Sequence, residues 1–359
     1  MKELNENRNY VCSERAHFMC PNMHFGILAQ IIGEYDEKKI RRSVDILQSA
    51  HPFLKSLIAI EGTGKLYYQQ QDCLKIPVAE KAGGADWQQD YHDISRHGWD
   101  VRKESLLKIL VYPKEHEFQI LFIAHHLLCD GRGLLQLAEE FAQHYVKGTA
   151  PSFAAERLIQ TIQDLPPGSD LPCISKLIIN DANRRWKKEH HKVIYNEYEE
   201  FEKTYISQNR IERNIITTDK QELEEIQLLC RQQGISINDY LIAGMMLKED
   251  TNKVVIAADI RKHLRCYRQG AMGNYSTAFS VVIKKIEGDT VSLAKRVSEK
   301  VSDIIRHPQK EMLVLACYLR MQPELIDAVA ISTLGKFESK AGEFVGKNMF
   351  GYGSHEPYN

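Results

Sequence analysis

Residues 118–131 have the sequence FQILFIAHHLLCDG, which combines a strand pattern with two adjacent histidines and a turn. From Phe118 to His126 the alternation of side chains across a strand sends His126 to one face of the sheet and His125 to the other. Only one of the two imidazoles can serve a given site, so the pair is not expected to chelate a metal ion.

A tight turn and a helix are predicted directly after this strand. Asp130-Gly131 is a turn-forming pair, and the turn brings the aspartate back beside the strand end. Gly133 to Lys147 carries an apolar stripe at helical spacing, and Gly148 predicts its end.

The rest of the chain alternates between helix and strand patterns and predicts the α/β class. Four further helices are predicted. One begins after Asp36, one lies between Asp219 and Gly234, and the other two are Ser236–Leu247 and Val291–Ile305. Predicted strands are Leu54–Ile60, Lys65–Gln70, Leu106–Tyr112, Ile211–Thr217, Val254–Ala258 as a buried strand, Ser276–Lys284 and Ala328–Leu334.

The composition shifts once along the chain, and this shift predicts the domain organisation. We expect a first half over residues 1–165, a crossover over 166–208 and a second half over 209–359. Within the crossover, the basic run Asn183 to Lys192 could meet the phosphates of a nucleotide cofactor. A solvated linker face is the interpretation we favour, since charge blocks usually mean only that.

Bulk composition excludes several classes of protein. Lys plus Arg number 47 and Asp plus Glu 48, so the charge balance indicates neither a nucleic-acid nor a membrane partner. The eight cysteines contain no C-x-x-C spacing, which argues against a zinc knuckle, and we expect them mostly reduced and buried. With a polar N-terminus and no apolar run long enough to span a bilayer, the chain is expected to be cytoplasmic.

His126 is suited to general-base chemistry. A histidine whose pKa lies near 6.5 can take a proton from a hydroxyl or amine at neutral pH. That nucleophile would attack a thioester directly, because the chain has no G-x-S-x-G motif for a covalent intermediate.

The stretch His125-His126-Leu-Leu-Cys-Asp130-Gly131 resembles the HHxxxDG signature of the chloramphenicol-acetyltransferase-like superfamily, which includes condensation domains and alcohol and polyketide-associated acyltransferases. The likeness extends over roughly residues 10–335. Its other parts are Ser13 to Ile32 with Gly33-Glu-Tyr-Asp36, which resembles an opening strand and first helix, His51-Pro-Phe-Leu54, Ser236-Ile-Asn-Asp239, Ala258-Asp-Ile-Arg261 with Gly273-Asn-Tyr275, and Ile331-Ser-Thr-Leu-Gly335.

This resemblance implies a fold, a reaction and a set of partners. The fold would be two chloramphenicol-acetyltransferase-like lobes with mixed sheets and an active-site tunnel between them. The reaction would move an acyl group from a coenzyme A thioester to a small hydroxyl or amine acceptor, with no permanently bound cofactor and no metal. Two alternatives stay open: a condensation-type enzyme whose donor rides on the phosphopantetheine of an acyl carrier protein, and a non-catalytic binding member.

The resemblance also assigns roles to residues. His126 is the catalytic base, and Asp130 belongs to the catalytic motif as a structural residue paired with Arg261. His125 and Gly131 are structural support. A candidate oxyanion or tunnel-wall group contains Asn274, Tyr275 and Ser276, although an ordinary loop and strand start explains these residues equally well.

Three further expectations concern the early histidines, Cys129 and the length of the chain. His17 and His24 could line the acceptor pocket, but we favour ordinary surface histidines. Cys129 could be a nucleophile, but a buried thiol is the interpretation we favour. At 359 residues the chain is short for the superfamily, which predicts either a compact member or one that lacks its last strands.

Overall fold

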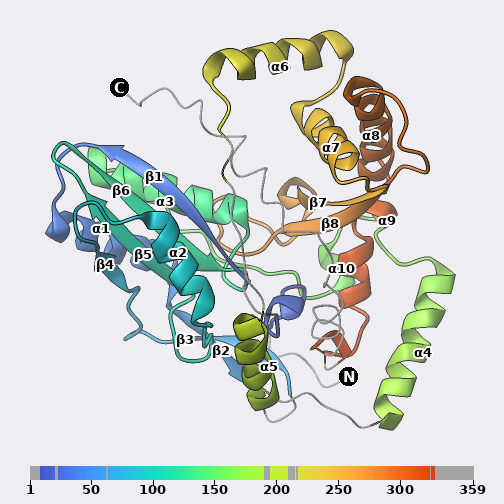
Figure 1. Cartoon of the computed structure of the whole chain (residues 1–359). Helices are drawn as coiled ribbons and strands as arrows, with labels where there is room; N and C mark the ends of the chain where they lie inside the picture. Colours follow the sequence, from blue (N-terminus) through green and yellow to red (C-terminus); the bar gives the residue numbers. More distant parts are fainter. Residues whose placement is uncertain are drawn as a thin grey trace.

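The computed structural model describes residues 9–20, 23–61, 64–189, 195–208, 215, 217–323 and 325–327. Helices and strands alternate along this part of the chain and confirm the α/β class (Figure 1).

A four-stranded sheet organises the first part of the chain. Its order is β1 (His24–Ile32), β6 (Glu117–His125), β5 (Leu107–Pro113) and β4 (Val78–Glu80). β6 is antiparallel to both of its neighbours, whereas β4 runs parallel to β5. Since β6 is a central strand, its last residue, His125, lies inside the sheet and not at an edge.

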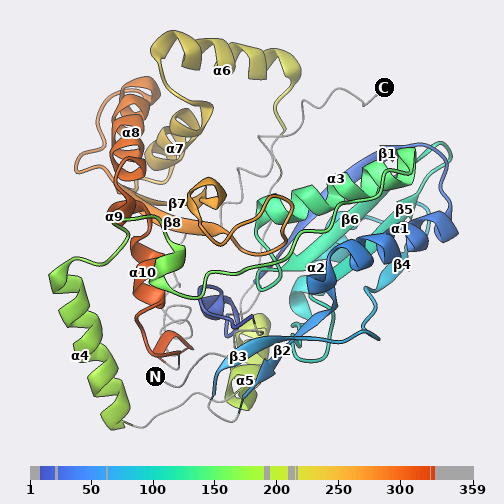
Figure 2. The same ribbon diagram turned by 180° about the vertical axis from the view of Figure 1, so that it is seen from behind.

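Helices cover both faces of this sheet. α1 (Glu37–Ala50) and α3 (Gly131–Lys147) lie on one face and α2 (Trp87–Arg96) on the other, as Figures 1 and 2 show from opposite sides. On the α3 face, the rings of Phe122 and Phe141 pack edge to face with their centroids 5.5 Å apart. On the α2 face, the Tyr91 hydroxyl donates to the carbonyl oxygen of His24.

Two antiparallel hairpins complete the β structure of the described residues. β2 (Ser56–Ile60) pairs with β3 (Leu66–Gln70), and β7 (Lys253–Asp259) pairs with β8 (Ser276–Val282). α7 (Ile237–Lys248) and α8 (Thr290–Ile305) pack beside the β7–β8 hairpin, away from the four-stranded sheet (Figure 1).

The remaining helices connect or flank these units. They are α4 (Cys173–Glu189), α5 (Tyr195–Gln208), α6 (Lys220–Gln233), α9 (Pro308–Glu311) and α10 (Leu313–Tyr318), with 3₁₀ turns η1 (Arg15–His17), η2 (Pro52–Lys55), η3 (Ile162–Asp164) and η4 (Arg261–His263).

The buried apolar residues form two separate clusters. The larger surrounds the four-stranded sheet, and residues from much later in the chain, such as Met272, Tyr275 and Met312, join it. The smaller lies among α7, α8, β7 and β8. The late residues in the larger cluster therefore tie the two parts of the chain together.

Local sequence signals predicted many element ends correctly. Asp36 caps α1 by accepting a hydrogen bond from the backbone of Lys39. Gly148 ends α3 in the left-handed conformation, and Ser236 with Asp239 forms a complete capping box at the start of α7.

Two expectations were wrong in detail. The helix expected from Gly133 begins at Gly131, because Asp130 acts as its N-cap instead of standing free in a turn. The strand Val254–Ala258 was expected to be buried, but β7 alternates between exposed and partly buried residues, and Val255 is 62% exposed. Nothing in the described part of the chain covers that face of the hairpin.

The crossover segment also holds more regular structure than expected. α4 and α5 lie within it, and the basic side chains of Arg184 and Arg185 are largely exposed, as a solvated face requires. α2 and β4 were not predicted at all. Most of the strand expected at Ile211–Thr217, the strand expected at Ala328–Leu334 with its Gly335 motif, and the tail to Asn359 lie outside the described residues.

Candidate functional site

His126 lies immediately after the end of β6, on the face of the sheet that α1 and α3 cover. Its backbone N–H donates to the carbonyl oxygen of Met23 at 2.7 Å, which continues the pairing of β6 with the start of β1. The imidazole is half-buried and lies between two rings, Phe25 at 4.4 Å and His17 at 5.1 Å between centroids. The ring is thus held in place and still partly open to solvent.

His125 points to the opposite face, as the strand alternation predicted. Its Nδ1 accepts a hydrogen bond from the backbone N–H of Leu127, and Trp99 packs against its ring edge-on. Burial, together with the neighbouring His24 and His126, holds the pKa of His125 well below its usual value. A neutral, enclosed imidazole of this kind supports the strand end and is unsuited to exchanging protons with a substrate.

Asp130 is the point at which the turn, the helix and the second part of the chain meet. Its Oδ1 caps α3 by accepting from the backbone N–H of Gly133, and its Oδ2 accepts from the backbone N–H of Tyr275. Arg261 donates to both carboxylate oxygens, at 2.7 and 2.9 Å. The ion pair expected between these residues is therefore present, and only 11% of the Arg261 side chain and 6% of the Asp130 side chain are exposed.

The charge of Arg261 is secured by its neighbours. Burial by itself lowers the pKa of Arg261, but Asp130 and then Asp259 more than reverse this and hold it above its usual value. A guanidinium that stays charged and donates to both oxygens of a carboxylate holds the two side chains in one fixed geometry.

The turn is packed too closely for larger residues at two glycines. A Cβ on Gly133 would lie 2.9 Å from the Cβ of Cys129. Gly273 has a φ of +147°, and a Cβ there would lie 2.7 Å from a methyl carbon of Leu158. Gly133 thus allows the start of α3 to pack on the turn at Cys129, and Gly273 allows its loop to approach Leu158 in the first part of the chain.

Asn274, Tyr275 and Ser276 lie close to this turn but differ in what they can do. The side chain of Tyr275 is fully buried and its N–H is used by Asp130, so neither group is available to a substrate. Asn274 lies 6% exposed beside both His17 and the carbonyl of His126. The Ser276 hydroxyl donates to the amide oxygen of Asn274.

Cys129 is a buried thiol, as we favoured from the sequence. It is fully enclosed, and burial followed by the charge of Asp130 raises its pKa well above the usual value. A thiol that resists ionisation is a poor nucleophile. All eight cysteines are free, but the expectation that most are buried was wrong, because only Cys129, Cys230 and Cys266 are.

The two early histidines are partly buried. His24 lies on the His125 face, where its Nε2 lies 3.0 Å from the Ser95 hydroxyl, whereas His17 stacks on His126. The sequence named His17 but gave no means to place it, because the contact joins a 3₁₀ turn to a strand end far along the chain.

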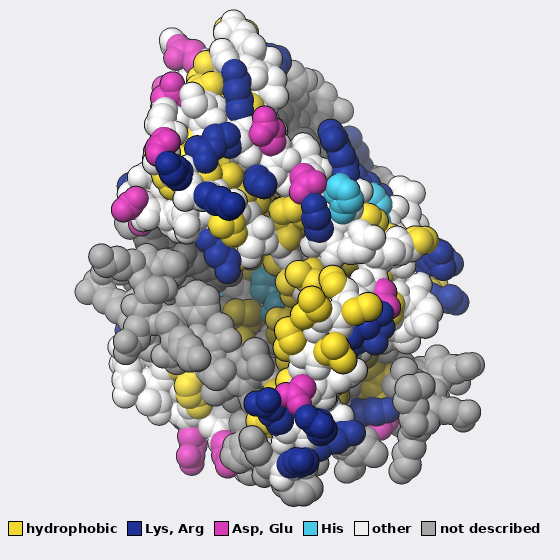
Figure 3. Space-filling view, turned by 90° about the vertical axis from the view of Figure 1, so that its right-hand side faces the viewer, with side chains coloured by type: hydrophobic (Ala, Val, Ile, Leu, Met, Phe, Trp, Pro, Cys, Tyr) yellow, Lys and Arg dark blue, Asp and Glu magenta, His cyan; other side chains and the backbone are white. Residues whose placement is uncertain are grey.

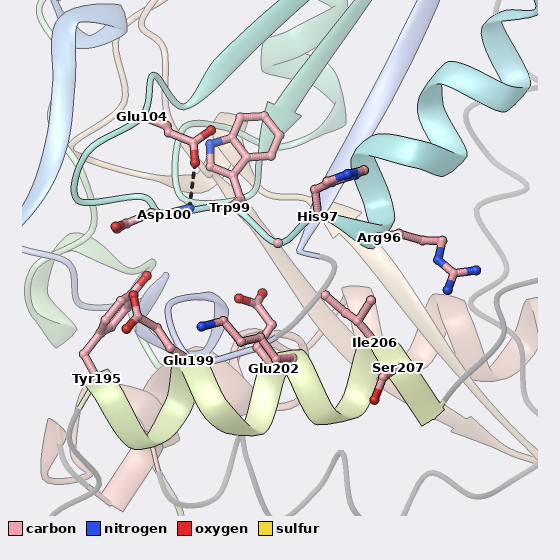
Figure 4. Close-up of a pocket in the computed structure, with 12 residues that line it drawn as sticks. Arg96, His97, Trp99, Asp100, Glu104, Tyr195, Glu199, Glu202, Ile206 and Ser207 are labelled. Carbon is pink, nitrogen blue, oxygen red and sulfur yellow. Dashed lines mark hydrogen bonds between the residues drawn. The ribbon is translucent and has the colours of Figure 1, made fainter.

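A separate pocket lies on the α2 face. It has a volume of about 410 Å³, and its walls are the segment from Arg96 to Glu104 and one side of α5. Figure 4 shows Glu202 and Ile206 of α5 facing His97 and Trp99 across it. Burial raises the pKa of Glu202 to about 7. None of the residues lining this pocket belongs to the group around His126.

The face that carries α4 has a further surface feature. Ile174, Leu177 and Ile178 are 73%, 68% and 63% exposed, and a hydrophobic patch with basic side chains below it is visible there (Figure 3). The surface beside the patch is hollowed, and a histidine side chain lies in the hollow among hydrophobic ones.

Several solved structures resemble this fold, although their sequences are distant. The condensation domain of the monacolin K polyketide synthase MokA matches with a TM-score of 0.55 at 12% identity, over 88% of this chain and 76% of that one. The first condensation domain of the calcium-dependent antibiotic synthetase matches with a TM-score of 0.53 at 12% identity, over 84% and 75%. Polyketide synthase associated protein 5 from Mycobacterium tuberculosis matches with a TM-score of 0.52 at 15% identity, over the same shares.

The chain has a condensation-domain-like fold. Of the expected architecture, the mixed α/β fold like that of condensation domains is confirmed. Among curated proteins, a probable non-canonical nonribosomal peptide synthetase, CymA, from Salinispora arenicola (strain CNS-205) is 24% identical over 131 residues. That match covers 36% of this chain and 2% of the synthetase. No protein-family model matches the sequence.

In the described part of the chain, no helix combines the length and apolar character that a membrane crossing requires.

Proposed function

We propose that this protein is a condensation-type acyltransferase in which His126 is the general base. The observation that carries the proposal is the half-buried imidazole held between Phe25 and His17, directly before the turn that Asp130 and Arg261 fix. The fold, which is that of condensation domains, supports the reaction class.

The reaction follows from the chemistry of a neutral imidazole. His126 takes the proton of an acceptor hydroxyl or amine while that oxygen or nitrogen attacks the thioester carbonyl. The new carbon–oxygen or carbon–nitrogen bond forms and the carbon–sulfur bond breaks. The imidazolium then returns its proton to the departing thiolate, so no covalent enzyme intermediate is needed.

The donor is a thioester on a phosphopantetheine arm, and we propose that an acyl carrier protein bears this arm. Condensation domains among the structural neighbours and a synthetase-like relative favour this source over coenzyme A. Coenzyme A carries the same arm and stays the second candidate donor. In either case the arm would reach His126 through a tunnel between two lobes, which the hollow on the α4 face would open to solvent.

Within this proposal the loop after Gly273 lines the tunnel. Asn274 lies beside His126, and the side chains of Asn274 and Ser276 already donate hydrogen bonds to other groups of the protein. We therefore assign neither of them the oxyanion.

Thiol release tests the proposal directly. The protein is incubated with acyl-loaded carrier protein or with acyl-CoA, plus mixed alcohols and amines, and free thiol is measured. His126→Ala should lower release by about 10²- to 10⁴-fold. His116→Ala, at an exposed histidine between β5 and β6, is the matched control and should leave release unchanged. Equal release from His126→Ala and the unmodified protein would support a non-catalytic binding protein instead.

A further inference from the structure

Among the described residues, His17 has two polar contacts and one ring contact that belong to the candidate site. Its Nδ1 lies 3.4 Å from the sulfur of Met23, the residue whose carbonyl binds the backbone of His126. Its Nε2 lies 3.5 Å from the amide nitrogen of Asn274. Its ring stacks on that of His126 with an angle of 25° between the planes.

The orientation of the Asn274 amide is fixed by Ser276. The backbone N–H of Ser276, at 3.3 Å, faces the amide oxygen, as does its hydroxyl at 2.7 Å. A backbone N–H can only donate, so the atom it faces must be the oxygen. The NH₂ group of Asn274 is thereby turned toward His17 and toward the carbonyl oxygen of His126, at 3.4 Å.

This orientation selects one tautomer of His17. Because Asn274 donates to Nε2, that nitrogen carries a lone pair and the ring proton sits on Nδ1, directed at the Met23 sulfur. Burial, and secondly His126, lower the pKa of His17 to about 3. His17 is therefore a neutral ring that does not change its protonation state near neutral pH.

We propose that His17 is a positioning residue for His126: its ring, locked by Asn274, clamps the imidazole of His126 against Phe25 in the orientation that general-base catalysis requires. The loop before β8 thus sets the geometry of His126, the histidine immediately after β6. This inference rests on the proposed function, since positioning matters only if His126 exchanges a proton.

The stack interacts electrostatically with His125, although that ring faces the other side of the sheet with His24 and Lys108. After burial, His24, His126, His17 and Lys108 all lower the pKa of His125. Asp130 and Arg261 neutralise each other in their ion pair. From η1 itself, Arg15 pairs with Asp327, and Glu14 is buried.

The test separates positioning from folding and from the reaction. Histidine side chains are labelled with ¹⁵N, and the pKa of His126 is measured by NMR in the full chain carrying His17→Ala, His17→Phe or His17→Gln. Glutamine is the conservative variant, since its amide oxygen can accept from Asn274 as Nε2 does. His24→Phe, on the opposite face of the sheet, is the matched control.

The expected result is a rise in the pKa of His126 in His17→Ala, where water replaces a neutral ring. The turnover number kcat should fall about tenfold to a hundredfold, with KM changed less, because a misplaced base slows the chemical step. His17→Phe should restore the stacking but not the polar lock, and His17→Gln should recover the larger part of kcat. His24→Phe should leave the pKa of His126 unchanged.

An unchanged pKa of His126 and an unchanged kcat in folded His17→Ala would overturn the inference. If His17→Ala does not fold, an unchanged kcat in folded His17→Phe would overturn it, because phenylalanine keeps the stacking but cannot accept from Asn274. If the unmodified protein releases no thiol, the proposed function fails, whereas the NMR titration still decides whether His17 governs His126.

Discussion

Arg261 donates to both carboxylate oxygens of Asp130 across a separation of 131 residues in the sequence. The same carboxylate caps α3 and accepts the N–H of Tyr275, so four hydrogen bonds converge on one side chain. The turn after His126 is therefore held by a distant part of the chain as well as by its own residues. The ion pair thus connects the turn after His126 to the later part of the chain.

Replacing Asp130 should damage folding as well as chemistry. Asp130→Ala leaves a buried guanidinium without its main partner, and the loss of one member of such a pair costs about 3–5 kcal/mol. Urea unfolding should show this as a lower midpoint, and Arg261→Ala should have an effect of the same size. Asp259→Ala is the control, because Asp259 is 39% exposed and its ion pair with Arg261 should contribute at most about 1 kcal/mol. Equal losses of stability in Asp130→Ala and Asp259→Ala would contradict the structural role of the Asp130–Arg261 pair.

Gly133 and Gly244 offer a matched pair of helical glycines. A Cβ on Gly133 would meet the backbone-proximal Cβ of Cys129 at 2.9 Å, whereas one on Gly244 of α7 would lie 4.0 Å from the nearest atom, a methyl carbon of Thr290. Gly133→Ala should therefore lower the free energy of unfolding by about 1–3 kcal/mol through overpacking, and so lower the thermal midpoint. Gly244→Ala should raise the free energy of unfolding by up to about 1 kcal/mol and raise the midpoint, because alanine has a higher helix propensity than glycine. The opposite order would show that the turn near Cys129 can relax.

Short-range signals predicted much of the first half of the fold. The alternation from Phe118 to His126, the cap at Asp36 and the glycine at Gly148 each act within a few residues, and all three appear in the structure. The ion pair of Asp130 with Arg261 was expected, but the role of Asp130 as N-cap of α3 was missed because the helix start was placed at Gly133.

Long-range relationships were beyond the same reasoning unless a family likeness supplied them. The Asp130–Arg261 pair came from the resemblance, not from spacing. The contact of His17 with Asn274 spans 257 residues, and no local pattern encodes it. α2 was missed because its sequence, WQQDYHDISR, has few apolar residues. β4 was missed because it is three residues long and exists only through pairing with β5.

Thiol labelling of the native protein should separate the cysteines by exposure. Cys73 and Cys173 are exposed and should react with maleimide quickly, whereas Cys129 is fully enclosed and has a raised pKa, so it should react only after unfolding. Mass spectrometry of peptides after a short reaction gives the order, with a denatured sample as the control. Rapid modification of Cys129 in the native protein would show that the turn opens readily, which the ion pair argues against.

Glu14 should make stability depend on pH in a direction opposite to that of most carboxylates. Its side chain is 1% exposed, and neither oxygen accepts a hydrogen bond of ordinary geometry from the described residues. Burial raises its pKa from 4.5 to about 7, against weaker opposing contributions from groups of residues 12–14. The folded protein therefore keeps this proton in a range where the unfolded chain has lost it.

The sign follows from that difference. The stabilising contribution of protonated Glu14 is complete below pH 4.5, declines as the pH rises, and is lost above about pH 7. Glu14→Gln cannot ionise, so its stability relative to the unmodified protein should increase by about 3 kcal/mol between pH 4.5 and pH 8. Urea unfolding at a series of pH values measures this, with Glu115→Gln at an exposed position as the control. A difference between Glu14→Gln and the unmodified protein that stays constant with pH would mean that Glu14 ionises in the folded state as easily as in water.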